Sequence, residues 1–167
     1  MAGTAPSRYR SQIIPMKPVL QALVLAERVY TDHPSGKKII AGTFNEIRLE
    51  KFEVKEIELP DGSKRQEIPT VPGGIDMGSP MAYVSLTDVV DGTNISLQMV
   101  NMTKNEVMYK IDINIRNQDR LATVEIVAPL PPIRPFIHGA GTWSLDLVWR
   151  GEILGSHRLL IRQDQPA

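Results

Sequence analysis

The chain contains no cysteine among its 167 residues. This absence excludes disulfide bonds, zinc sites built from thiolates and a cysteine nucleophile. A charge surplus is missing as well, because 19 Lys and Arg residues balance 19 Asp and Glu residues. Proteins that bind nucleic acid or an anionic membrane usually carry a basic surplus, so we expect neither partner. No apolar run in the chain approaches the roughly 18 residues that a membrane-spanning helix needs.

The sequence also lacks the short motifs that mark common catalytic sites. It has no Gly-x-Ser-x-Gly nucleophile elbow, no phosphate-binding glycine loop and no His-Glu-x-x-His zinc pattern. Glu56 and Glu58 would share one face of a strand, which is typical of a solvated surface rather than of an acid/base pair. We therefore expect no enzyme activity, no cofactor, and no catalytic, cofactor-binding or metal-binding residue.

The three histidines are widely separated in the sequence. His33 lies in a predicted turn and is expected to be solvated. His157 shares the two-residue spacing of Ile153 and Leu159, which places it on an apolar face. This position predicts a hydrogen-bonded structural histidine. A hydrolase that uses His138 or His157 is the alternative, and it requires a cleft with a carboxylate partner.

What the chain does have is a two-residue alternation of apolar and polar side chains, which is cleanest over residues 107–115 and which, over residues 142–149, is followed by a hairpin link. Such alternation is typical of a strand with one buried face and one solvated face. Arg150-Gly151 follows, and a two-residue link of this kind suits a tight hairpin whose central positions have positive φ. The same alternation recurs between polar turns over 82–87, 95–99, 107–115 and 122–126.

Short strands at regular spacing predict an all-β protein, an antiparallel two-sheet β-sandwich that is immunoglobulin-like or jelly-roll-like, with about eight strands. A closed barrel is the alternative. Pro129 to Pro135 is predicted to run as an extended polyproline arch, and this long crossover favours two sheets. Trp143 and Trp149 share the apolar side of the alternation and are predicted to be core residues.

The first half of the chain is less regular. Val19–Val29 is predicted to be the first strand, although its continuous apolarity also suits a short helix. Lys37–Ile47 is predicted to be one returning strand, in which Gly42 marks a bulge or a close backbone approach. A charged ribbon is predicted to fold back around Pro60–Ser63. Residues 60–80 are then expected to form a long Gly/Pro-rich surface loop.

These elements predict a single domain over residues 18–163. Residues 1–17 are expected to be a disordered extension, and residues 164–167 a disordered tail. The basic residues before the apolar run Val19–Ala26 are suggestive of a signal peptide. The run is short, however, and Gln21 interrupts it, so we expect a cytoplasmic protein rather than a secreted one.

Several segments together resemble a bacterial family of small, uncharacterised β-sandwich domains with no assigned activity. The resemblance covers residues 18 to 162. It implies a β-sandwich, and it supplies no catalytic residue that could be carried over. The segments that carry it are Ala22–Ala26, Ser35–Lys38, Ile40–Ile47, Leu130–Pro132, Gly141–Leu147 and Gly151–Gly155.

We expect a non-enzymatic module that acts through protein contacts, with an unknown protein partner or with itself as a homo-oligomer. Edge strands offer unpaired backbone groups, and long loops offer variable surface. The loops at 60–80 and 129–141 are the surfaces expected to make these contacts. Their candidate interaction residues are Asp76, Met77, Phe136 and His138.

The alternative is a module that binds carbohydrate or calcium. An exposed aromatic platform would serve a sugar, and its candidates are Trp143, Trp149, Tyr83, Tyr109 and Phe136. Carboxylates gathered from several turns would serve calcium, although such residues are also ordinary turn formers. The acidic turn residues are Asp32, Asp61, Asp76, Asp88, Asp91 and Asp119.

Overall fold

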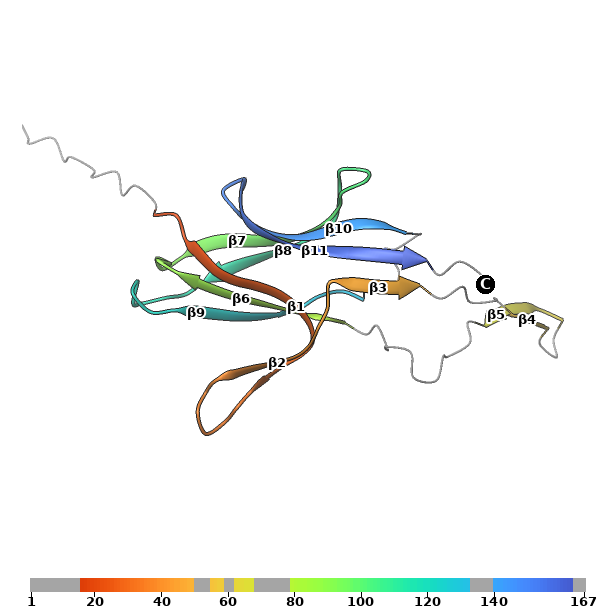
Figure 1. Ribbon diagram of the computed structural model, residues 1–167, viewed down its shortest axis with the longest axis horizontal. Helices are drawn as coiled ribbons and strands as arrows, with labels where there is room; N and C mark the ends of the chain where they lie inside the picture. Colours follow the sequence, from red (N-terminus) through yellow and green to blue (C-terminus); the bar gives the residue numbers. More distant parts are fainter. Residues whose placement is uncertain (1–15, 50–54, 59–61, 68–78, 133–139, 164–167) are drawn as a thin grey trace, which may run out of the picture.

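The computed structural model describes residues 16–49, 55–58, 62–67, 79–132 and 140–163 (Figure 1). Within these ranges the chain forms β-strands and no helix, as the alternating pattern predicts. Residues 1–15 of the predicted N-terminal extension and residues 164–167 of the predicted C-terminal tail fall outside the described residues. The strands are β1 (Val19–Thr31), β2 (Lys38–Thr43), β3 (Glu46–Leu49), β4 (Lys55–Glu58), β5 (Lys64–Glu67), β6 (Met81–Thr87), β7 (Thr93–Asn101), β8 (Glu106–Ile115), β9 (Val124–Pro129), β10 (Gly141–Trp149) and β11 (Glu152–Gln163).

Two sheets lie face to face and form the predicted β-sandwich (Figure 1). The four-stranded sheet has the order β2-β1-β6-β9, and the five-stranded sheet has the order β3-β11-β10-β7-β8. The chain passes from one sheet to the other between β9 and β10, where the proline arch over Pro129–Pro135 is predicted, although residues 133–139 are not described. β4 and β5 pair separately, as the antiparallel ribbon predicted around Pro60–Ser63.

The prediction of one strand over Lys37–Ile47 is wrong, because the chain changes sheets inside that segment. β2 pairs antiparallel with β1, whereas β3 joins the other sheet beside β11. The pair of β3 and β11 is parallel, so the sandwich is not purely antiparallel. The described residues therefore place nine strands in the two sheets, against about eight expected. The apolar pattern of this segment does not show where the chain moves from one sheet to the other, because both sheets bury the same kind of side chain.

Gly42 precedes this crossing and has a φ of +67°. The register of β1 with β2 is the same on both sides of it, with Ala26 opposite Thr43 and Arg28 opposite Ala41. The bulge predicted at Gly42 is therefore wrong. A Cβ at this position would lie 2.7 Å from Oε2 of Glu27, so the close approach is to a side chain. Gly42 supplies a left-handed turn of the backbone that other residues adopt at a cost.

The core lies between the sheets. Leu25, Val84 and Leu86 are fully buried on the four-stranded side, and Leu97 and Leu145 are fully buried on the five-stranded side. Full burial of a leucine side chain contributes about 2 kcal/mol, so the inner faces of these strands hold the sheets together. Trp143 belongs to this core, as predicted, whereas Trp149 is only half-buried and packs at its margin.

Two register shifts reverse the face of residues that simple alternation places inside. One lies in the β10–β11 pair, where Leu147 is opposite Gly155 but Val148 is opposite Ile153. The other lies in the β7–β8 pair next to Val107. Ile153 and Val107 are exposed as a result. The hairpin turn itself is as predicted, since Arg150 and Gly151 have φ values of +50° and +82°.

Candidate functional site

The residues proposed from sequence as interaction sites cannot be placed. Asp76 and Met77 lie in the segment 68–78, and Phe136 and His138 lie in the segment 133–139. All four are outside the described residues, so their predicted roles stay predictions.

His157 has the structural role that the sequence predicts. It is half-buried opposite Leu145, and its Nε2 lies 3.0 Å from the backbone oxygen of Phe44. Because a carbonyl oxygen can only accept, Nε2 carries the proton and donates it. This bond ties β11 to the point where the chain crosses between the sheets. The partner of His157 is thus a backbone carbonyl and not the carboxylate that a hydrolase would need.

The acidic turn residues that the structure describes are bonded to neighbouring groups. Asp91 accepts a hydrogen bond from the backbone amide of Asn117 at 3.1 Å and lies 3.9 Å from Arg116. Oδ1 of Asp88 lies 4.0 Å from Nε of Arg120. Over the described ranges, no three His, Asp or Glu side chains gather where a metal ion could bind. These aspartates serve the turns in which they lie.

A more distinctive surface begins where β1 leaves the sandwich. β1 pairs with β6 up to Ala26 and afterwards with β2 alone. The hairpin of residues 28–41, called the arm below, bends out of the four-stranded sheet on the side away from the five-stranded sheet (Figure 1). Its turn is closed by a hydrogen bond of 2.7 Å from the amide of Gly36 to the backbone oxygen of Asp32.

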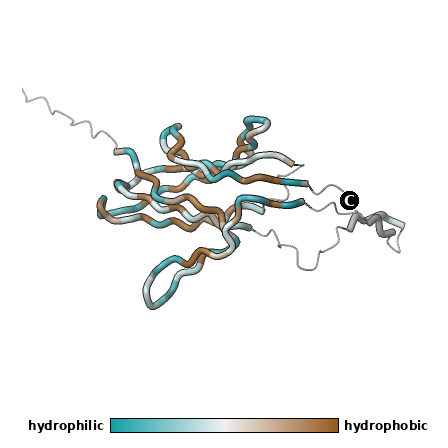
Figure 2. Tube along the Cα trace, in the orientation of Figure 1, coloured by the Kyte–Doolittle hydropathy of each residue, from teal (hydrophilic) through white to brown (hydrophobic). Residues whose placement is uncertain are grey.

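Both faces of the arm carry apolar side chains. Tyr30 and Ile39 are a cross-strand pair, with 54% and 53% of their surfaces exposed. Val29 and Ile40 form the next pair, on the opposite face, and are half-buried. Figure 2 shows hydrophobic colour on part of the arm and hydrophilic colour at its tip. Two-stranded ribbons are marginally stable alone, so an arm of this composition gains stability when something covers it.

The exposed face of the arm continues the outer face of the four-stranded sheet. Val24 and Tyr30 share one side of β1, and Tyr83 and Val127 lie beside Val24 across β6 and β9. Ala26 lies at the corner between arm and sheet and is fully buried, although it is not part of the core cluster. We call Val24, Tyr30, Ile39, Tyr83 and Val127 the clasp surface.

One charged side chain borders the clasp surface on β9. The Tyr83 hydroxyl donates a hydrogen bond to the carboxylate of Glu125. This bond, with smaller contributions from burial and from the charge of Glu125, raises the pKa of Tyr83 above its usual value of 10.0. The phenol therefore stays protonated and anchors Glu125 at the edge of the surface.

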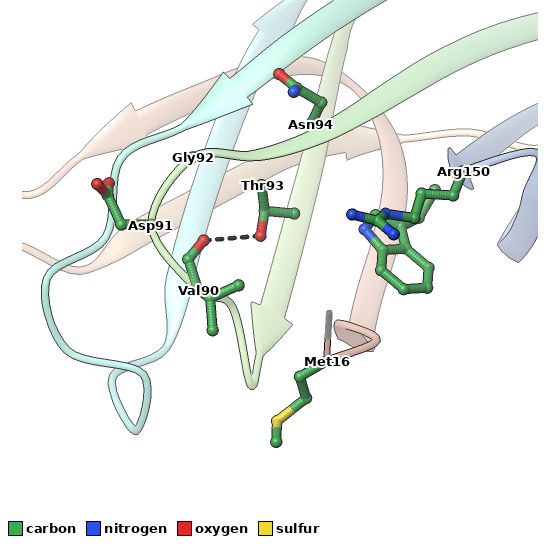
Figure 3. Close-up of a pocket in the computed structure, with 8 residues that line it drawn as sticks. Met16, Val90, Asp91, Gly92, Thr93, Asn94 and Arg150 are labelled. Atoms are coloured by element: carbon green, nitrogen blue, oxygen red, sulfur yellow. Dashed lines mark hydrogen bonds between the residues drawn. The ribbon is translucent and has the colours of Figure 1, made fainter. Parts of the chain in front are cut away.

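A pocket of about 240 Å³ opens at one end of the sandwich (Figure 3). Its walls come from the segment before β1, from the turn between β6 and β7, and from the β10–β11 hairpin. The guanidinium of Arg150 stacks on the indole of Trp149, with Cζ 5.2 Å from the ring centroid. The residues that line the pocket are Met16, Val90, Asp91, Gly92, Thr93, Asn94, Trp149 and Arg150.

No protein-family model matches this chain, and no curated protein matches it. The described residues include no helix long and apolar enough to cross a membrane.

One further polar group lies in the middle of the five-stranded sheet. Asp146 points away from the core and is 7% exposed, between Gln98 of β7 and Ser156 of β11. Its Oδ1 atom has no hydrogen-bond partner among the described residues. A buried carboxylate without a partner destabilises a protein, and native structures contain few of them.

The sequence alone does not predict the clasp surface or the pocket. Tyr30 follows the predicted first strand and Ile39 lies in the predicted returning strand, and nothing in the local sequence shows that β2 is an edge strand among the described residues. Trp149 read as core by its spacing. The tight turn next to Trp149 is the sequence signal that could place this tryptophan at the margin of the core, since a turn holds neighbouring side chains at the end of a sheet.

Proposed function

We propose that this protein is a non-enzymatic β-sandwich module that self-associates through the clasp surface. The observation that carries the proposal is the pair of Tyr30 and Ile39, each about half exposed on an arm whose two strands, the end of β1 and β2, pair with each other. Isolated exposed apolar residues are common, but a paired set continuous with a sheet face is typical of an interaction site.

A second copy of the chain fits this surface. Two-fold symmetry brings the same patch of each copy together, so the arm of one copy lies on Val24, Tyr83 and Val127 of the other. Covering the exposed halves of Tyr30 and Ile39 contributes about 1 kcal/mol for each side chain to the free energy of association, and the two-fold symmetry doubles this contribution. Lys37 at the exposed arm tip and Glu125 beside the sheet face have opposite charges, which supports the same pairing.

The test is the mass of the protein in solution, measured by size exclusion with light scattering over a range of concentrations. The wild type should show an assembly that dissociates on dilution. A variant with Tyr30→Thr and Ile39→Thr should remain a single chain at every concentration, because threonine keeps strand propensity while removing apolar area.

Leu121→Ser is the matched control. Leu121 is 81% exposed and lies outside the arm, so its loss should leave the assembly unchanged. A wild type that is a single chain at the highest concentration contradicts self-association. An arm variant that assembles as the wild type does shows that the clasp surface is not the contact.

The alternative of carbohydrate binding has one feature in its favour, the half-buried ring of Trp149 in the pocket. The polar side chains that a sugar would use there are already bonded. Asp91 is held by Asn117, and Oδ1 of Asn94 accepts a hydrogen bond of 2.7 Å from Asn114. We therefore do not assign carbohydrate to this pocket.

A further inference from the structure

We propose that the pocket beside Trp149 and Arg150 binds a small carboxylate that carries a flat or branched apolar group. This site is separate from the clasp surface, and its argument does not rest on self-association. Three features carry it: a cation with no acidic partner among the described residues, apolar side chains over part of the wall, and a turn that fixes the backbone at the cation.

Arg150 supplies the cation. Its guanidinium stacks on Trp149, and it takes part in none of the ion pairs among the described residues. Glu152 is the acidic residue nearest in sequence, and it pairs with Lys17 instead. A planar guanidinium held on an aromatic ring is well suited to bind a carboxylate through two parallel hydrogen bonds.

Each of the other polar side chains of the pocket already makes one hydrogen bond, and Arg150 carries the only positive charge among the residues that line it. Thr93 donates its hydroxyl to the backbone oxygen of Val90 at 2.7 Å (Figure 3). Asp91 and Asn94 are bonded to Asn117 and Asn114. In Figure 3 the carboxylate of Asp91 points away from Arg150, so it does not neutralise the site.

The remaining walls are apolar. Val90 and Met16 face solvent in part, and the half-buried Trp149 also lines the pocket. A volume of about 240 Å³ lies below the usual range for drug-sized ligands, and it suits a group the size of one side chain. An inorganic anion would leave these apolar walls uncovered, so an organic carboxylate fits better.

The turn fixes where the cation lies. Arg150 has a φ of +50°, a conformation that arginine rarely adopts. Asparagine tolerates the same conformation, so Arg150→Asn removes the charge and leaves the turn intact. This variant separates loss of the ligand from loss of the fold.

Titration with benzoate and with its neutral analogue benzamide tests the site, with the indole N–H resonance of Trp149 as the readout. Trp149→Phe assigns that resonance, since Trp143 is the only other tryptophan. Benzoate should shift the resonance saturably, and benzamide should bind at least about tenfold more weakly, because it lacks the charge. Arg150→Asn should weaken benzoate by about the same factor, while Arg158→Asn, which removes an exposed arginine elsewhere on β11, should not.

Two further ligands identify the source of the carboxylate. N-acetylphenylalanine and its amide present the end of a peptide with and without the charge. Tighter binding of N-acetylphenylalanine than of benzoate indicates a peptide C-terminus, and weaker binding indicates a free small acid. Benzamide that binds as well as benzoate, an Arg150→Asn variant that binds as the wild type does, or inorganic phosphate that binds as tightly as benzoate would each overturn the proposal.

Discussion

At the scale of the residue, Asp146 departs most from what its position requires. The middle strands of a sheet normally place small or apolar side chains where neighbours crowd them, and Ser96 and Ser144 follow this rule nearby. Asp146 instead holds a carboxylate that is 7% exposed, with Oδ1 unpaired within the described part of the chain. The cost of removing Oδ1 from water is then not offset by a hydrogen bond to that atom.

Asp146→Asn should therefore raise the free energy of unfolding by about 1 kcal/mol, because it removes the charge and keeps the shape. Urea unfolding of the two proteins measures the difference. Asp112→Asn is the control, since Asp112 is exposed and pairs with Lys110 at 3.0 Å on the surface. Its effect should stay within about 0.5 kcal/mol. A less stable Asp146→Asn protein would show that the carboxylate stabilises the fold.

Among the elements, β1 lies close against β11 between the two sheets, and Gly155 is one point of close approach. A Cβ on Gly155 would lie 2.4 Å from Cδ2 of Leu20, closer than any real contact of this kind. Gly155 also adjoins the register shift of β11. The absence of a side chain at this position thus sets how closely the first strand approaches the last.

Gly155→Ala should lower the free energy of unfolding by about 1–2 kcal/mol, because Leu20 must move to admit the methyl group. Adding Leu20→Ala should remove the clash, so the two changes should be coupled in a double-mutant cycle. Gly141→Ala is the matched control, because its Cβ would meet its nearest neighbour at an ordinary 3.6 Å. Equal urea midpoints for the two alanine variants would refute the steric account.

At the scale of the whole molecule, stability should fall as the pH rises above 10. Burial raises the pKa of Tyr109 well above its usual 10.0, and the hydrogen bond to Glu125 raises that of Tyr83. The unfolded chain then loses these protons first, so alkaline pH favours unfolding, and the stability is fully present below pH 10. Tyr109→Phe should flatten the decline in urea unfolding experiments above pH 10. A decline as steep as that of the wild type would contradict this assignment.

Most of the architecture follows from the two-residue alternation, since each strand that buries one face repeats it. The class, the hairpin at Arg150-Gly151, the charged ribbon and the role of His157 are confirmed. The crossing after Gly42, the parallel β3 and the reversed faces of Ile153 and Val107 depend on which strands meet in space. The local sequence pattern does not determine which strands pair. The clasp surface and the pocket share this origin, because each combines segments distant in the sequence.

The pairing of β3 with β11 also sets an order of events in folding. Ile47 of β3 lies beside Ile161 of β11, so this strand pair forms only after nearly all of the chain between them has folded. The β1–β2 hairpin, by contrast, is local and can form early. Newly made chains therefore expose the apolar β1–β2 hairpin before the sandwich is complete, and a high concentration of chains at that stage favours association between neighbouring chains.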